Sequence, residues 1–527
     1  MCLAALPVAW LGGAALLAAL SGSNGLAAYT LPRSAMDTAL LMVGVGVISG
    51  AIGLITAWLV THFEFPFRQV LQWALVLPLA VPTYLAAYTF VEFADFTGPL
   101  QTAFRAISGA QLITEYWFPD IRSFGGATIA FSCVLFPYTY IACRALFLME
   151  SGTMSSAART LGATSAGAFW RVTLPISRPA LVVGTSLAMM EVVNDLGAVQ
   201  YFGVNTLTAQ IYSEWINRAN FGGAAQLALV IVLVISLLIY LEHRARGNRL
   251  YRAARDHKQP PARDRLRGAP AAIATAACAL PVMAGFGIPA GELIGLAAKH
   301  LNASAVELTG KAALATVLLS LAGAALTVCT ALLTARHMRQ PGRTRIAPRL
   351  ATLGYAIPGT VLALGLLQPL GLLDIRFNQM TLALFDWRPG LILSGSIAAL
   401  LYLYAIRFLA VGHGNLLEGM NKRGDSVIEA AKMLGARRFR LFVTVDLPTL
   451  SPAILGAAVL IFVEIAKELP GTLLLRPIGV ETLATLVYSR ANAGLIAEAA
   501  LPGLAIVLVG LVPVVLASRL SEKRRSR

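Results

Sequence analysis

The sequence predicts an all-α polytopic membrane protein, built from two tandem, parallel repeats of six membrane-spanning helices. Of its 527 residues, 57% are hydrophobic and only 13% are charged, and the mean hydropathy is +0.71. A soluble domain has about 25% charged residues, so this composition excludes an ordinary soluble enzyme. The apolar residues gather in separate stretches, and one polar loop with a fixed pattern occurs twice.

The spans are predicted from stretches that lack Asp, Glu, Lys and Arg, because a spanning helix needs about 20 apolar residues. Such stretches are 1–32, 38–61, 69–91, 123–143, 221–241, 268–291, 312–335, 350–373, 389–406 and 499–518. Two more spans are expected to begin at Pro179 and near Thr449, and each is interrupted by an acid. The sequence therefore predicts about twelve spans. The first should remain as an uncleaved helix, since no basic residue precedes Arg33.

The repeated loop is the strongest internal signal. Residues 156–175 read SAARTLGATSAGAFWRVTLP, and residues 425–448 read DSVIEAAKMLGARRFRLFVTVDLP. A single offset superposes the matching pairs: Ala157-Ala158 on Ala430-Ala431, Gly162 on Gly435, Pro175 on Pro448, and Glu191 on Glu464. Such agreement indicates a tandem duplication. An even number of spans in each copy makes the repeats parallel rather than inverted.

Each loop is expected to form a short helix, a glycine elbow and a second short helix at the membrane surface. Ser426 and Glu429 have capping-box spacing, which predicts a helix start. The first copy has Ser156 in place of Glu429 and lacks this box. A helix that touches only lipid headgroups is the alternative. The glycine at one fixed place in both copies favours docking to a protein.

Charge sets the orientation and the domain limits. The net charge is +16, and most of the 42 Lys and Arg residues lie on the side of the repeated loops, which predicts that these loops are cytoplasmic. This asymmetry explains the charge without nucleic acid. The expected domains are a first repeat at 1–245 with its loop at 149–178, and a basic cytoplasmic linker at 246–267. A second repeat at 268–518, with its loop at 411–448, precedes a basic cytoplasmic tail at 519–527.

The sequence offers little support for catalysis. Gly310-Lys311 is followed by Ala312, so no phosphate-binding G-x-x-x-x-G-K-[ST] loop is present. No nucleophile–base pair stands out. The five cysteines lie within apolar spans and form no C-x-x-C pair, which predicts neither disulfides nor a high-affinity metal site. We therefore expect no enzyme activity and no cofactor bound by this chain.

The loop pattern E-A-A-x-x-x-G followed by Leu-Pro resembles the cytoplasmic EAA loop of ABC importer permeases. The stretches EVVNDLGAVQYFGVNTLTAQIY (191–212) and EIAKELPGTLLLRPIGVETLATLVYSRA (464–491) resemble the fused ferric-iron permeases, and this resemblance covers essentially the whole chain. It implies a type I importer fold in the cell inner membrane. It also implies two copies of a separate ATPase subunit that binds ATP, and a periplasmic or lipid-anchored substrate-binding protein. The implied ATPase-coupling residues are Ala157, Ala158, Gly162, Pro175, Glu429, Ala430, Ala431, Gly435 and Pro448.

Four acids near the repeated loops are the candidate translocation residues. Glu191 and Asp195 are four residues apart, as are Glu464 and Glu468, which places each pair on one helix face. An acid in the membrane centre costs about 2.5–3.5 kcal/mol on insertion scales, so four of them require compensation or a function. One interpretation is structural, with Lys467 pairing one acid. The other is a path for a hard cation, with Glu191 and Glu464 as transient contacts.

The substrate alternatives are thiamine or another small cation. A secondary transporter driven by an ion gradient is a further alternative, but it leaves the two repeated loops unexplained. Ferric iron is the substrate that the resemblance implies.

Overall fold

The fold is given by a computed structural model, which describes residues 2–20, 25–149, 162, 164, 167, 169–246, 263–338, 354, 357–423, 429, 431, 433–434 and 438–525. The chain packs into two compact units. Unit 1 comprises Met1–Asn24, Glu214–Leu229 and Ala303–Leu486, and unit 2 comprises Gly25–Ser213, Val230–Asn302 and Val487–Arg527.

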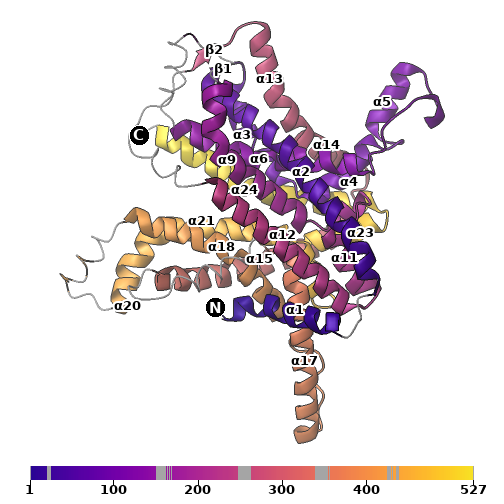
Figure 1. Cartoon of the computed structure of the whole chain (residues 1–527), viewed down its shortest axis with the longest axis vertical. Coiled ribbons are helices and arrows are strands. Elements are labelled where there is room, and N and C mark those ends of the chain that lie inside the picture. The colour runs from indigo at the N-terminus through magenta and orange to yellow at the C-terminus, as the bar shows by residue number, and fades with distance from the viewer. Residues whose placement is uncertain are drawn as a thin grey trace. The chain divides into compact units, whose positions relative to one another are not determined.

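Three long helices form the centre of unit 2 (Figure 1). They are α2 (Gly25–His62), α6 (Phe124–Met149) and α9 (Leu174–Asn194), and each packs against the other two. Small residues allow close approach: a Cβ on Gly53 would lie 2.7 Å from the Tyr140 backbone nitrogen. Apolar side chains from α2 and α6, including Leu54 and Phe136, are buried between them.

Unit 1 repeats this arrangement with the matching helices of the second half (Figure 1). These are α15 (Ala303–Met338), α18 (Ile397–Arg423) and α21 (Leu447–Ala466), which again pack pairwise. His413, Leu416 and Met420 are buried at helical spacing and hold α18 in helical form as far as Arg423. Residues 411–423, which the sequence analysis counted with the second loop, therefore continue α18.

The first span of each repeat packs against the other repeat. In unit 1, α1 (Cys2–Leu20) lies along α17 (Gly359–Phe385), where Trp10 Nε1 donates a 2.9 Å hydrogen bond to Gln368 Oε1. In unit 2, α13 (Ala269–Val282) and α14 (Ile288–Lys299) contact α2, α4 (Thr83–Ala94) and α24 (Ile496–Arg525). The repeats are defined by sequence and the units by packing. These two divisions differ at the exchanged first spans, and also at Glu214–Leu229 and Val487–Arg527, which belong to the unit formed mainly by the other repeat.

A short parallel pairing ties the end of the linker to the first repeat. Strand β1 (Phe63–Glu64) pairs with β2 (Asp264–Arg265), and Leu266 N donates to Glu64 O at 3.0 Å. The Glu64 carboxylate also forms an ion pair with Arg68, with the Arg68 Nε atom 2.9 Å from Glu64 Oε2. Within the described ranges this is the one sheet, and the rest of the regular structure is helical.

Short elements connect the long helices. They are α3 (Arg68–Ala74), η1 (Leu77–Ala80), α5 (Pro99–Ser108), η2 (Ile113–Glu115), η3 (Phe169–Thr173), α10 (Gly197–Tyr201), α11 (Leu207–Tyr212), η4 (Ser213–Asn217), η7 (Met283–Gly287), α20 (Arg438–Leu441), η9 (Phe442–Asp446), α22 (Pro470–Leu475) and α23 (Leu483–Asn492). The long helix α12 (Phe221–Arg246) follows η4. Elements η3, η4, η7 and η9 are π-helical turns, and η1 and η2 are 3₁₀ turns.

The predicted all-α polytopic fold is confirmed. By length and composition, nine helices of the described chain are suited to cross a membrane, or ten when a pair bent by 98° (Arg68–Ala80 with Thr83–Ser108) counts as one span. The shorter apolar helices Leu6–Leu20 and Ile496–Val512 occupy the places of the first and last predicted spans. Each of the twelve stretches predicted from sequence therefore corresponds to an apolar helix or to the bent pair.

Candidate coupling and translocation sites

Each repeated loop ends in a π-helical turn that leads directly into a long helix. Turn η3 precedes α9, and η9 precedes α21 at the matching place. A proline lies two residues after each turn, Pro175 in one repeat and Pro448 in the other. A proline ring clashes with the carbonyl four residues earlier and offers no N–H to it. The wider π turn relieves this clash by moving that carbonyl.

A third π turn supports this explanation. Turn η7 ends at Gly287, two residues before Pro289. The fourth, η4, has no proline at this spacing, so proline is one cause of these turns and not a requirement. In the repeated loops the duplication has kept both the proline and the turn.

The phenylalanine that begins each loop π turn is held by a side chain near the end of a neighbouring long helix. The Phe169 ring centroid lies 4.7 Å from that of Trp58, which is on α2. Arg336, on α15, places its Cζ 4.4 Å from the Phe442 ring centroid and a guanidinium nitrogen 3.5 Å from the Asp446 carboxylate. Each loop is therefore attached to the corresponding long helix of its own repeat, which is α2 in the first and α15 in the second. The contact joins two aromatic rings in the first repeat, and a cation and an aromatic ring in the second.

The described coupling residues fit a surface that presents apolar side chains. Glu429 is exposed and Ala431 is half-buried. Met433 and Leu434 are 90% and 88% exposed. Pro175 and Pro448 occupy the first turns of α9 and α21. Four residues of the predicted site lie outside the described residues: Ala157, Ala158, Ala430 and Gly435. The predicted capping residue Ser426 also lies outside them.

Gly162 shows why the first loop needs glycine. Its φ is +87°, in the left-handed region that residues with a Cβ rarely adopt, and a Cβ there would meet no atom within 4 Å. Glycine is thus required at this position for its backbone conformation, and not because space for a side chain is lacking.

The second acid of each predicted pair organises a break in its span. Asp195 follows the last residue of α9 and accepts a 2.6 Å hydrogen bond from Ala198 N, at the start of α10. The Thr83 hydroxyl also donates to Asp195. Glu468 follows α21 and accepts 2.8 Å hydrogen bonds from the first amides of α22. Both carboxylates thereby cap short helices, where they compensate amides that lack helical partners.

The acids differ in burial and in their cationic partners. Asp195 and Glu468 are 7% and 4% exposed, whereas Glu191 and Glu464 are half-buried. Arg407 lies 3.5 Å from Glu468, whereas Asp195 forms no ion pair with any residue that the structure describes. Lys467 pairs with Glu464 at 2.8 Å, as the structural interpretation predicted. The two halves have therefore diverged in charge around one common backbone break.

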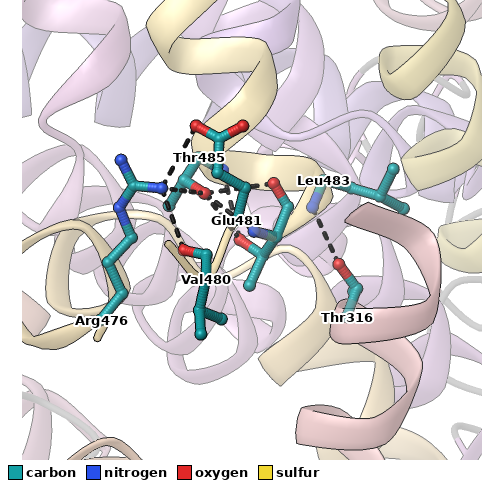
Figure 2. A network of polar contacts seen from close by, with 7 residues as sticks. Thr316, Arg476, Val480, Glu481, Leu483 and Thr485 are labelled. Atoms are coloured by element: carbon teal, nitrogen blue, oxygen red, sulfur yellow. Dashed lines mark hydrogen bonds and ion pairs between the residues drawn. The ribbon is translucent and has the colours of Figure 1, made fainter. Parts of the chain in front are cut away.

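A second duplicated contact fixes the chain beyond this break. Leu207 N donates to Thr38 Oγ1 at 2.9 Å. In the other repeat Leu483 N donates to Thr316 Oγ1 at 2.8 Å (Figure 2). Each threonine lies within a long helix, and each leucine begins a short one. This pairing was not predicted from sequence, because a single threonine within an apolar stretch carries no local signal.

The segment before Leu483 forms a polar loop at the surface of unit 1 (Figure 2). Arg476 donates to Val480 O at 3.1 Å and lies 3.3 Å from a Glu481 carboxylate oxygen. The loop lines a hollow of about 510 Å³, formed by Arg476, Pro477, Ile478, Gly479 and Glu481. Ile478 is fully exposed at its tip.

The comparisons with known proteins decide the family. The profile described as "Binding-protein-dependent transport system inner membrane component" matches residues 49–249 and 327–527, once in each repeat. The chain belongs to this family. It is accordingly the membrane subunit of a binding-protein-dependent ABC importer, a multi-pass protein of the inner membrane, and its family implies an ATPase and a substrate-binding protein as partners.

Relatives differ in how much of the chain they match. The Fe(3+)-transport system permease protein FbpB 2 of Haemophilus influenzae is 24% identical over 92% of this chain and 90% of its own length. The molybdenum transport system permease protein ModB of Escherichia coli is 29% identical over 36% of this chain and 82% of its own length. The sulfate transport system permease protein CysW of Escherichia coli is 28% identical over 39% of this chain and 70% of its own length. This importer permease thus resembles the FbpB 2 protein over both repeats, and the molybdenum and sulfate permeases over a stretch of about one repeat.

Proposed function

We propose that this importer permease translocates ferric iron. The observation that carries the proposal is the match to the Fe(3+) permease FbpB 2, which extends over 92% of the chain and includes both repeats. The acids near the span breaks support it, because carboxylate oxygens suit a hard cation. Within the described residues, no group of three or more His, Cys, Asp or Glu side chains could hold a metal ion. Passage is expected to use brief contacts, because a tight site would trap the ion.

The two repeated loops are proposed to receive the force of ATP hydrolysis. Two ATPase subunits, one at each loop on the cytoplasmic side, contact the predicted coupling residues and move the loops when they close on ATP. The exposed Met433 and Leu434 offer apolar surface for this docking. Each loop leads through its π turn into α9 or α21, which ends at the span break. A displacement of the loop is thereby passed along one helix to the acids.

Glu191 and Glu464 are the proposed cation contacts at these breaks. They are half-buried, whereas Asp195 and Glu468 are buried and cap short helices. We expect the double change Glu191→Gln and Glu464→Gln to lower iron uptake strongly while ATP hydrolysis stimulated by loaded binding protein persists. Unchanged uptake would remove both acids from the path.

The deciding experiment is uptake of ⁵⁵Fe³⁺ by cells that express this chain with its ATPase and binding protein. Uptake should require ATP hydrolysis and should not be reduced by excess thiamine, sulfate or molybdate. Competition by thiamine would favour the small-cation alternative, and competition by either oxyanion would favour the chemistry of the sulfate and molybdenum permeases. Transport that persists without the ATPase would contradict the ATP-driven mechanism.

The proposed orientation has its own test. A reporter fused after Arg255 should be cytoplasmic, and reporters fused after Gln101 and Asn378 should be external. An external signal from the Arg255 fusion would overturn the orientation and the number of spans.

A further inference from the structure

Two tyrosines from matching positions of the repeats meet in unit 2. Tyr212 ends the segment VNTLTAQIY and Tyr488 ends its duplicate VETLATLVY. The Tyr488 side chain lies within hydrogen-bond reach of Tyr212, and its hydroxyl donates to Gln200 Oε1 at 2.7 Å. The contact therefore joins matching segments of the two repeats within unit 2.

More phenol groups gather beside the pair. The rings of Tyr88 and Tyr201 meet edge to face, with centroids 4.5 Å apart. Tyr88 is also close enough to Tyr84, Asp195 and Tyr488 to interact with them electrostatically. It lies on α4, and Tyr201 is the last residue of α10, the short helix that follows Asp195. The cluster therefore adjoins the span break of the first repeat.

Polar atoms in this cluster are buried without hydrogen-bond partners among the described residues. They are the hydroxyls of Tyr88 and Tyr201 and the Oδ1 atom of Asn194. Tyr88 is only 1% exposed and Asn194 only 7%. A buried hydroxyl without a partner destabilises a fold, so its presence calls for a role other than packing.

The second repeat does not have this chemistry. The positions matching Tyr84, Tyr88 and Tyr201 hold three residues without a phenol: Thr360, Leu364 and Pro477. The second repeat also places Arg407 3.5 Å from Glu468. The phenol groups thus occur in the first repeat together with Asp195, the acid for which no ion pair is described.

We propose that Tyr88, Tyr201 and Asp195 form a contact site for ferric iron beside the span break of the first repeat. Phenol and carboxylate oxygens are hard donors, and tyrosine is an established iron ligand. The carboxylate disfavours an oxyanion at the same place. Arg122 lies 5.0 Å from the Tyr201 ring centroid, but it is half exposed and 4.0 Å from the Asp95 carboxylate, which offsets its charge. The inference rests on the proposed iron function.

The test removes the two hydroxyls and keeps the rings. The double variant Tyr88→Phe with Tyr201→Phe should fold as well as the wild type, because neither hydroxyl has a described partner. Its ⁵⁵Fe³⁺ uptake should fall about tenfold, the effect expected from one lost favourable contact. Tyr404→Phe is the matched control: its hydroxyl is hydrogen-bonded to Thr472 Oγ1 at 2.7 Å, in the second repeat. That variant should lose thermal stability but retain uptake per folded molecule.

The outcomes separate this inference from the proposed function. If the wild type imports ⁵⁵Fe³⁺ and the double variant imports it at the same rate, the tyrosine site is wrong and the iron function stands. If the wild type imports no iron, both the tyrosine site and the proposed iron function are wrong. A double variant that loses thermal stability in parallel with uptake would show a packing role and overturn the site.

Discussion

Arg336 lies over the ring of Phe442, with its Cζ atom 4.4 Å from the ring centroid. The contact joins the end of α15 to the π turn that follows the second loop. In the first repeat, Trp58 contacts Phe169 at the matching place. The same mechanical connection is thus made by a cation in one half and by an aromatic ring in the other.

Replacing Arg336 should weaken coupling in the second half. Arg336→Gln removes both the cation–π contact and the charge that faces Asp446. Arg336→Lys keeps the charge but not the planar guanidinium that stacks on a ring. We expect iron uptake per ATP hydrolysed to fall in the order wild type, Lys, Gln. Equal transport stoichiometry in all three proteins would show that this contact transmits nothing.

Pro448→Ala should uncouple transport from ATP hydrolysis. Alanine restores the N–H and removes the ring, so the turn before α21 is expected to become α-helical. A change of one residue in register rotates the loop by about 100° relative to the span. The purified complex should retain ATPase activity and lose uptake. Pro289→Ala, which alters a π turn outside the loops, is the control and should transport normally.

Gly162 distinguishes backbone conformation from space. Gly162→Ala should impair coupling because alanine disfavours a φ of +87°, although the position has room for a methyl group. Gly162→Asn should retain more activity, since asparagine tolerates the left-handed conformation better. Uptake assays on both variants at equal expression decide this. Better function of the alanine variant would mean that the conformation is not required.

The duplicated threonine contact predicts matched losses of stability. Thr38→Val and Thr316→Val each leave a leucine amide without its acceptor, at a cost of about 1–3 kcal/mol. Thr→Ser at either position keeps the oxygen and should cost less. Thermal unfolding of the purified protein in detergent measures the effect. A valine variant as stable as its serine counterpart would contradict the structural role.

The acids of the second repeat should separate stability from transport. Glu468→Gln breaks a buried ion pair, which typically costs about 3–5 kcal/mol. Glu464→Gln affects a half-buried pair with Lys467, where a value of about 1 kcal/mol or less is expected. The melting temperature should therefore drop markedly only for Glu468→Gln. A larger drop for Glu464→Gln would reverse the assigned roles.

Features carried by local pattern were predictable from sequence. The spans follow from uncharged stretches and the duplication from matched positions. That Lys467 pairs with one of the acids was also open to prediction, but not that this acid is Glu464. The capping role of Asp195 has a sequence signal, since Asp is a favoured helix cap, but the same residue fits an intramembrane acid equally well. Contacts between distant segments had no local signal in the sequence. Trp58 and Arg336 differ chemically, and nothing in their own stretches indicates a phenylalanine more than a hundred residues away.

The exchange of first spans has a consequence for biosynthesis. Trp10 and its partner Gln368 are 358 residues apart, so most of the chain must be synthesised before α1 meets α17. Contacts between such distant segments form slowly, and unpaired segments are exposed to misassembly in the meantime. A nascent chain stalled after its first repeat would hold α1 without its packing surface in the bilayer. Joining both repeats in one polypeptide ensures that each early helix is followed, on the same ribosome, by the helix that receives it.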